Sequence, residues 1–181
     1  MKVLMIIPAY NEEESILNTV MSIVEYRKKV DFDLDYVVIN DGSVDRTKEI
    51  LDNHHLNAIH LVMNLGIGGA VQTGYKYALE KNYDVAVQFD GDGQHDIESL
   101  DALLEPIRRQ QADLVVGSRF IGDKSSEFQT TFMRRFGITI ISAFIKLTTG
   151  KRILDTTSGY RLANRDIIRQ FAARYPIKYP E

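Results

Sequence analysis

The chain has 181 residues, of which 44% are hydrophobic, and it contains no cysteine. This composition is typical of one globular domain, and it excludes a disulfide framework and any cysteine-ligated zinc site. The longest apolar stretch, residues 136–145, ends at Lys146. It is shorter than the roughly 18 residues of a membrane span, so no spanning segment is predicted.

The net charge of −3 conceals a difference between the two parts of the chain. Residues 1–100 hold 8 basic and 17 acidic residues, whereas residues 101–181 hold 14 basic and 8 acidic residues. Two interpretations are open. The charges are either scattered over the surface, or they form an acidic, metal-binding half beside a basic half that meets an anion or a membrane surface.

Short apolar runs alternate with stretches of helical periodicity along the chain. The pattern predicts strands over residues 3–7, 36–39, 58–63, 85–89 and 114–116, and helices over residues 12–26, 44–53, 68–79 and 96–109. This alternation favours an α/β fold with a mostly parallel, Rossmann-like sheet flanked by helices. Residues 1–181 are expected to form a single domain.

A polar cluster follows each predicted strand. The five clusters are Pro8–Glu12, Asn40–Ser43, Asn64–Gly69, Asp90–His95 and Gly117–Arg119. In open sheets of this type, ligands bind beyond the carboxyl ends of the strands. Because all five clusters fall at such ends, we expect them to form one site.

The fourth cluster carries candidate metal ligands. Asp90 and Asp92 flank a single glycine, and Gln94 and His95 follow them. Hard oxygen ligands of this kind suit Mg²⁺ or Mn²⁺, which also bind substrate phosphates. The other interpretation is an acidic turn that caps the next helix. An EF-hand calcium loop is excluded, because His95 and Asp101 occupy the positions that need glycine and glutamate.

The second and third clusters carry candidate nucleotide contacts. Asp41 is placed to accept a hydrogen bond from the imide or amide N–H of a nucleobase, whereas Ser43 or Asp45 can cap the following helix. Residues 66–69 are rich in glycine but lack the spacing of the dinucleotide fingerprint. Their glycines, including Gly68, are expected to allow a tight loop, and Gly74 is expected to allow close helix packing.

The basic part of the chain contains an amphipathic stretch and a polar turn. Residues 132–147 carry cations at both ends of an apolar face, which indicates either a core-facing helix or a helix at a membrane surface. Residues 155–161 are predicted to be a polar turn whose Arg161 can face a phosphate.

Five motifs occur in this order: Pro8-Ala9-Tyr10-Asn11-Glu12, Asn40-Asp41-Gly42-Ser43-x-Asp45-x-Thr47, Asp90-x-Asp92-x-Gln94-His95, Gly117-Ser118-Arg119 and Thr157-Ser158-Gly159-Tyr160-Arg161. Together they resemble the inverting family 2 glycosyltransferases, most closely the polyprenyl-phosphate branch that is like dolichyl-phosphate mannose synthase. The resemblance covers essentially the whole chain. It implies a GT-A type fold, that of the nucleotide-diphospho-sugar transferases.

The resemblance also implies roles for the matched positions. The nucleotide-binding set is Pro8, Ala9, Tyr10, Asn11, Glu12, Asp41 and, from the glycine-rich loop, Gly68. The metal set is Asp90, Asp92 and Gln94, and the catalytic set is Asp90, Asp92 and Arg119. The acceptor-binding set is Arg119, Arg134, Arg135, Ser158 and Arg161. Two departures stand out: Asn40 replaces the usual aspartate, and relatives continue beyond residue 181, so a C-terminal part is expected to be missing.

The implied activity is that of a metal-dependent hexosyltransferase. It moves a sugar, with inversion, from a UDP- or GDP-linked donor to a polyprenyl phosphate. A phosphate acceptor is already anionic and needs no base, which fits the few carboxylates after residue 120; Asp155 is the spare candidate for a base.

Three alternatives remain: elongation of a cell-surface polysaccharide, a non-catalytic nucleotide-sugar-binding module, and a nucleotidyltransferase, which would usually carry a basic, glycine-rich first loop. The expected partners are the donor, the lipid acceptor, the membrane surface, and a small membrane protein or a second copy of the chain; no nucleic acid is expected. The expected location is the cytoplasm, peripherally at the inner face of the membrane.

Overall fold

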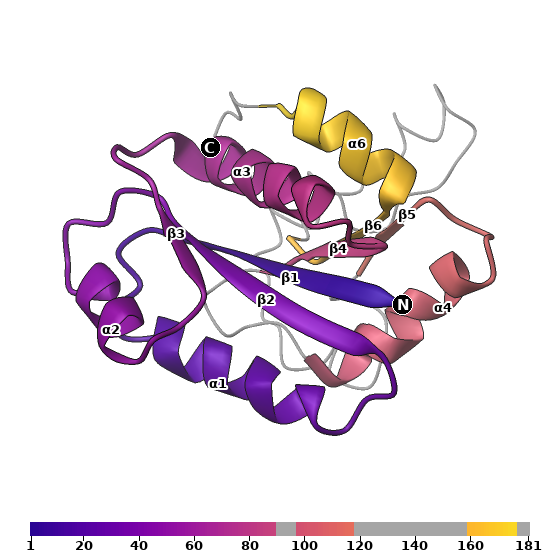
Figure 1. Ribbon diagram of the computed structural model, residues 1–181, viewed down its shortest axis with the longest axis horizontal. Coiled ribbons are helices and arrows are strands. Elements are labelled where there is room, and N and C mark those ends of the chain that lie inside the picture. The colour runs from indigo at the N-terminus through magenta and orange to yellow at the C-terminus, as the bar shows by residue number, and fades with distance from the viewer. Residues whose placement is uncertain (90–96, 118–158, 177–181) are drawn as a thin grey trace, which may run out of the picture. The chain divides into compact units, whose positions relative to one another are not determined.

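The structure is a computed structural model that describes residues 1–89, 97–117 and 159–176 (Figure 1). The chain divides into two compact units, residues 1–115 with 161–181, and residues 116–160. Nearly all described residues belong to the first unit. The candidate metal ligands, the amphipathic stretch at residues 132–147 and most of the candidate acceptor-binding residues lie outside the described ranges.

A six-stranded sheet forms the centre of the fold, in the order β3-β2-β1-β4-β6-β5. The first four strands of this order run parallel to one another, and β6 pairs antiparallel with β4. The strands are β1 (Lys2–Ala9), β2 (Asp33–Asn40), β3 (Ala58–His60), β4 (Val85–Gln88), β5 (Leu114–Val116) and β6 (Arg161–Asn164).

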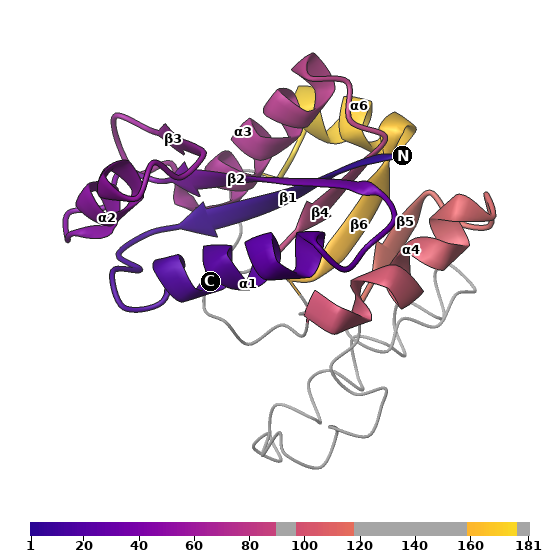
Figure 2. The same cartoon turned by 60° about the horizontal axis from the view of Figure 1, so that its bottom comes forward.

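Helices cover both faces of this sheet (Figures 1 and 2). Helices α3 and α6 lie on one face, and α1 and α4 lie on the other, with α2 beside β3. The helices are α1 (Ile16–Arg27), α2 (Thr47–Asn53), α3 (Gly66–Glu80), α4 (Leu100–Arg108), which follows the 3₁₀ turn Ile97–Ser99, and α6 (Arg165–Ala173). No helix in the described parts of the chain is long and apolar enough to cross a membrane.

The core is built around β1, whose residues 3–7 are completely buried. A strand that is apolar on both faces is typical of the centre of a parallel sheet covered by helices. Helix α3 approaches this strand closely at Gly74, where a Cβ atom would lie 2.2 Å from Cγ2 of Ile6. The packing role predicted for Gly74 is therefore confirmed.

All five predicted strands and the four predicted helices occur; β5 has the predicted ends, and the other elements have shifted ends. Helix α1 begins at Ile16 rather than at residue 12, and β3 ends at His60 rather than at residue 63. The prediction for residues 155–161 is wrong at Arg161, because this residue begins β6 and pairs with Gln88 of β4. The sequence analysis also missed α6, whose N-cap Asn164 accepts hydrogen bonds from the backbone N–H groups of Asp166 and Ile167.

Candidate functional site

The carboxyl ends of β1, β2 and β3 lie side by side. Ala9 of β1 is paired with Asn40 of β2, which is paired in turn with His60 of β3. The backbone N–H of Asp41 donates to Ala9 O at 2.9 Å, and that of Leu61 donates to Asn40 O at 2.9 Å. These bonds continue the sheet one residue beyond the strands, so the first three polar clusters begin at one edge, as predicted.

Asn11 joins the loop after β1 to the loop after β2. Its backbone has a positive φ of 56°, a conformation that asparagine tolerates better than most residues. Its N–H donates to Ser43 Oγ at 3.0 Å, and its Oδ1 accepts from the N–H of Val44 at 2.9 Å. The hydroxyl of Ser43 therefore holds the neighbouring loop. Of the two residues predicted to cap the following helix, Ser43 does not, whereas Asp45 accepts from the N–H of Thr47, the first residue of α2.

The next two residues of the first loop are held in the same way. Glu12 N–H donates to Thr47 Oγ1 at 2.8 Å, and Glu13 N–H donates to Asp45 Oδ2 at 3.1 Å. The other oxygen of Asp45 accepts from the N–H of Thr47 at 2.9 Å. Burial alone would raise the pKa of Asp45, but these hydrogen bonds outweigh it and lower the pKa. The hydrogen bonds that join the two loops therefore favour the ionised form of the Asp45 carboxylate.

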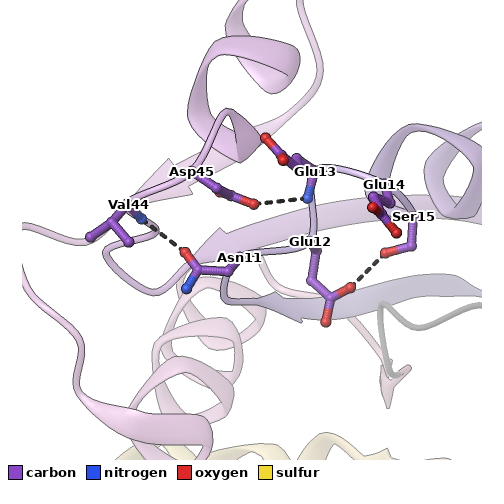
Figure 3. Close-up of a pocket in the computed structure, with 7 residues that line it drawn as sticks. All are labelled: Asn11, Glu12, Glu13, Glu14, Ser15, Val44 and Asp45. Carbon is purple, nitrogen blue, oxygen red and sulfur yellow. Dashed lines mark hydrogen bonds between the residues drawn. The ribbon is translucent and has the colours of Figure 1, made fainter.

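The joined loops line a strongly acidic pocket, which Figure 3 shows from close by. Its lining residues are Asn11, Glu12, Glu13, Glu14, Ser15, Val44 and Asp45. Glu12 accepts a hydrogen bond from Ser15 Oγ, and Glu13 forms an ion pair with Arg46 at 3.2 Å. Within the described ranges, no group of three or more histidine or acidic side chains is arranged to hold a metal ion. The predicted ligands Asp90, Asp92 and Gln94, together with His95, lie outside those ranges.

Asp41 ties the loop after β2 to the loop after β3. Its side chain is buried, with 3% of its surface exposed, and Oδ1 accepts from the N–H of Leu65 at 2.7 Å. No described residue bonds Oδ2. One oxygen of Asp41 therefore holds the loop after β3 in place.

The same two loops pack in direct contact at Gly42. This residue has a φ of +69°, and a Cβ atom there would lie 2.8 Å from both Asn64 N and Met63 C. Glycine is the residue that accepts both the positive φ and the missing space. The loop then closes on itself, because Asn64 Oδ1 accepts from the N–H of Gly66 at 2.9 Å, and helix α3 starts there.

The predicted nucleotide-binding residues lie in different environments. Pro8, Ala9 and Gly68 are buried, whereas Tyr10 and Asn11 are exposed and Glu12 is half-buried. Arg161 lies on β6, at the end of β4, and Arg119, Arg134, Arg135 and Ser158 lie outside the described residues. The sequence analysis missed the roles of Thr47 and Leu65, since the contacts of both join segments that are far apart in the chain.

Comparison with known proteins identifies the family. The sequence model of glycosyl transferase family 2 matches residues 5–171. The chain therefore belongs to this family, and the predictions of the family and of the glycosyltransferase class of enzyme are confirmed.

Several relatives carry names of lipid-phosphate glycosyltransferases. The chain is 35% identical to the undecaprenyl-phosphate mannosyltransferase of Micrococcus luteus, over 93% of this chain and 69% of that protein. It is 31% identical to the UDP-N-acetylglucosamine–dolichyl-phosphate N-acetylglucosaminyltransferase of Methanococcus voltae, over 91% and 70%. It is 28% identical to the polyprenol monophosphomannose synthase of Mycolicibacterium smegmatis, over 93% and 64%.

Solved structures agree with the predicted fold. The structure of glucosyl-3-phosphoglycerate synthase from Mycobacterium tuberculosis, in complex with Mn²⁺ and UDP-glucose, matches with a TM-score of 0.63 and 21% identity. The match covers 92% of this chain but 57% of that one, so the chain spans little more than half the length of this neighbour. At this identity the likeness shows the fold alone, and the predicted GT-A type fold is confirmed.

Proposed function

We propose that the chain transfers a sugar from a UDP- or GDP-linked donor to a polyprenyl phosphate, with inversion at the anomeric carbon. The three relatives named above share an acceptor of this class in their names, whereas two of the names give mannose as the sugar and one gives N-acetylglucosamine. The acceptor is therefore better supported than the sugar. Residues 1–181 act as a single catalytic domain in this proposal.

The observation that carries the donor part of the proposal is the joined edge of β1, β2 and β3. Three loops from separate strands are held together there by side-chain to backbone hydrogen bonds. Such an edge is where open α/β sheets bind nucleotides. The free oxygen of Asp41 accepts the N–H of the base, and the exposed ring of Tyr10 lies against the nucleoside.

The loop after β4 binds the diphosphate end of the donor in this proposal. Phe89, the residue before Asp90, donates its backbone N–H to Ile6 O at 2.9 Å, so β4 leaves the sheet at this same edge. The donor set of Asp90, Asp92 and Gln94 consists of hard oxygen atoms, which fits Mg²⁺ or Mn²⁺. A bound cation would neutralise charge on the leaving diphosphate.

The acceptor phosphate is held by cationic and hydroxyl side chains in this proposal. They are Arg119, Arg134, Arg135, Ser158 and Arg161. A phosphate oxygen attacks the anomeric carbon on the face opposite the diphosphate, and the bond to the diphosphate breaks with its electron pair on the leaving group. The oxygen is already anionic, so no carboxylate base is required.

The reaction then takes place where the lipid phosphate lies. We place the chain peripherally at the inner, cytoplasmic face of the membrane, with a small membrane protein or a second copy of the chain as a further partner. Vesicle sedimentation with and without anionic lipid tests the placement: recovery of all the protein in the supernatant at low salt would contradict it.

The decisive experiment measures binding and transfer with a panel of UDP- and GDP-sugars in the presence of Mn²⁺ or Mg²⁺. A thermal shift with one donor class, followed by transfer to a short polyprenyl phosphate, supports the proposal. Asp92→Ala should abolish transfer, whereas Asp31→Ala should not, because Asp31 is 94% exposed and precedes β2, whereas the site lies beyond the other end of that strand. Transfer to a soluble sugar alone would overturn the proposal in favour of polysaccharide elongation, and binding without turnover would overturn it in favour of a non-catalytic binding module.

The acceptor role is tested separately. Arg134→Ala and Arg135→Ala should raise the KM for the lipid phosphate much more than the KM for the donor. Equal effects on both substrates would contradict an acceptor-binding role for these residues.

A further inference from the structure

Both ring nitrogens of His60, the last residue of β3, are hydrogen-bonded within the protein. Nδ1 lies 3.0 Å from Nδ2 of Asn40 on β2, and Nε2 lies 3.1 Å from Oδ1 of Asp52 on α2. Asn40 is buried, with 2% of its surface exposed. A buried amide needs a hydrogen-bond partner for its oxygen and for its NH₂ group. The partner of one of these atoms therefore decides which of them faces His60.

The hydrogen positions of this group follow from one fixed donor. The backbone N–H of Ser43 points to Asn40 Oδ1 at 3.1 Å, so the oxygen of the amide must face Ser43 and the NH₂ group must face His60. Nδ1 of His60 therefore accepts, and the ring proton resides on Nε2, where it donates to Asp52. The geometry assigns His60 a neutral imidazole in the Nε2–H tautomer.

This chain of hydrogen bonds reaches the candidate nucleotide site. Asn40 supports the N–H of Ser43, and Ser43 Oγ in turn accepts the N–H of Asn11. Asp41, whose carboxylate holds the third loop, lies between Asn40 and Ser43 in the sequence. The loop that carries Asp41 is thus connected to His60 through the side chain of Asn40.

We propose that His60 is a positioning residue for the nucleotide site, and that a second proton on its ring releases the loop after β2 and weakens nucleotide binding. This inference rests on the proposed function for its ligand. A proton on Nδ1 would place two donors against each other, at His60 and Asn40. If the Asn40 amide turned to relieve this clash, its NH₂ group would face the N–H of Ser43, and the bond to Ser43 would be lost.

The charged groups around His60 do not oppose this effect. Among the described residues, α2 presents Asp52 and, beyond it, Lys48, while β2 presents the uncharged Asn40. The Lys48 ammonium lowers the pKa of Asp52, so that carboxylate stays ionised where histidines titrate. It accepts from Nε2–H in both states of the ring, and the change on protonation is confined to Nδ1.

The identity of residue 40 matters to this arrangement. An aspartate there would still accept from Ser43, but its other oxygen would face the lone pair of Nδ1. Such a carboxylate requires a proton on Nδ1, so Asn40→Asp should convert His60 to an imidazolium ion. Ring ¹⁵N shifts at neutral pH distinguish the two states.

Two variants separate positioning from simple packing. His60→Asn places Oδ1 close to the position of Nδ1, so it retains an acceptor for Asn40 and cannot titrate. His60→Leu retains bulk but has no acceptor. His54→Asn is the matched control, because His54 is exposed and ends helix α2 nearby.

The first measurement follows the ring of His60 and the amides of Asn11, Ser43 and Val44 by ¹⁵N NMR as the pH is lowered. The amide shifts should move with the ring in the wild type and in His54→Asn, and this movement should be absent in His60→Asn. Amide shifts that are independent of the ring would overturn the inference, whether or not a nucleotide binds.

The second measurement is the affinity for UDP and GDP over the same pH range. At neutral pH, His60→Leu should bind roughly two- to tenfold more weakly, the effect of one hydrogen bond, and His60→Asn should match the wild type. As the pH falls, affinity should decrease in the wild type and stay level in His60→Asn. If the wild type binds nucleotide equally at each pH, the inference is overturned. If the wild type binds no nucleotide, the proposed function is overturned instead. The NMR measurement would then still test the effect of His60 on the loop.

Discussion

The carboxylate of Asp41 accepts a hydrogen bond from the backbone N–H of Leu65, 24 residues further along the chain, at 2.7 Å. Asp41 is also buried, with 3% of its surface exposed. The residue that the sequence assigns to the nucleobase therefore also fixes the loop that leads into α3. The structural role of Oδ1 and the proposed base contact of Oδ2 can be separated by mutation.

Asp41→Asn should fold almost normally but lose nucleotide affinity. The Asn oxygen can still accept from Leu65, whereas its NH₂ group would face the donor N–H of the base. Asp41→Ala should lose both contacts and be less stable by about 0.5–1.5 kcal/mol, the net contribution of one hydrogen bond, because the bond to Leu65 is only partly buried. Urea unfolding and calorimetric titration with UDP and GDP measure the two effects. An Asp41→Asn protein that binds as tightly as the wild type would contradict the base contact.

Gly42→Ala should destabilise the protein more than Gly66→Ala. Both glycines have positive φ angles, +69° and +77°, but a Cβ at Gly42 would collide with backbone atoms of residues 63 and 64, whereas at Gly66 it would meet nothing within 4 Å. The backbone strain alone costs roughly 1–2 kcal/mol, and the collision adds roughly 1–3 kcal/mol at Gly42. Equal losses of unfolding free energy in the two variants would show that the loops do not pack as described.

The fold could be predicted from the sequence because its main signals are local and periodic. The buried run of β1 and the helical spacing of α3 each lie within one short window. Strand β6 was missed because Arg161–Asn164 is too short to show alternation. Its place beside β4 depends on pairing with Val85, which lies in a distant part of the chain.

The candidate site was predictable in position but not in its contacts. The rule that ligands bind at the carboxyl edge of a parallel sheet located the loops. The partner of each side chain was not predictable: Ser43 resembled a helix cap, yet its hydroxyl bonds Asn11, 32 residues away. The sequence around Ser43 or around Asn11 does not indicate that the two residues form a hydrogen bond. The metal- and acceptor-binding residues remain predictions of the sequence resemblance.

Tyr75→Phe should stabilise the protein, and Tyr83→Phe should destabilise it. The hydroxyl of Tyr75 is buried between α3 and α6 without a hydrogen-bond partner among the described residues, and burial raises the pKa of Tyr75. The Tyr83 hydroxyl donates to Asp35 at 3.0 Å. Because an unpaired buried hydroxyl costs free energy and a paired one contributes, we expect changes of about 1 kcal/mol with opposite signs. Urea unfolding of the two variants measures both changes. A loss of unfolding free energy in Tyr75→Phe would contradict the prediction and would show that the Tyr75 hydroxyl has a hydrogen-bond partner.

Asp45 should make the stability of the protein depend on pH in the acid range. Burial acts to raise the pKa of Asp45, but hydrogen bonds from Thr47 and from the N–H of Glu13 lower it below its ordinary value of 3.8. The folded state thus binds the proton less readily than the unfolded chain. The ionised carboxylate therefore stabilises the fold fully above about pH 4, and this stabilisation is lost as the pH falls through the lowered pKa.

Asp45→Asn tests this dependence, because the amide oxygen can accept from Thr47 or from Glu13 but carries no charge. At about pH 7 the variant should unfold more easily by about 1 kcal/mol, and below about pH 4 its stability should converge on that of the wild type. Asp31→Asn is the control: its side chain is 94% exposed and its ion pair with Arg108 is 3.7 Å long, so a change near zero is expected at every pH. The difference in unfolding free energy between Asp45→Asn and the wild type could instead stay constant down to about pH 3. That result would contradict a role for the charge of Asp45 in joining the loop after β1 to the loop after β2.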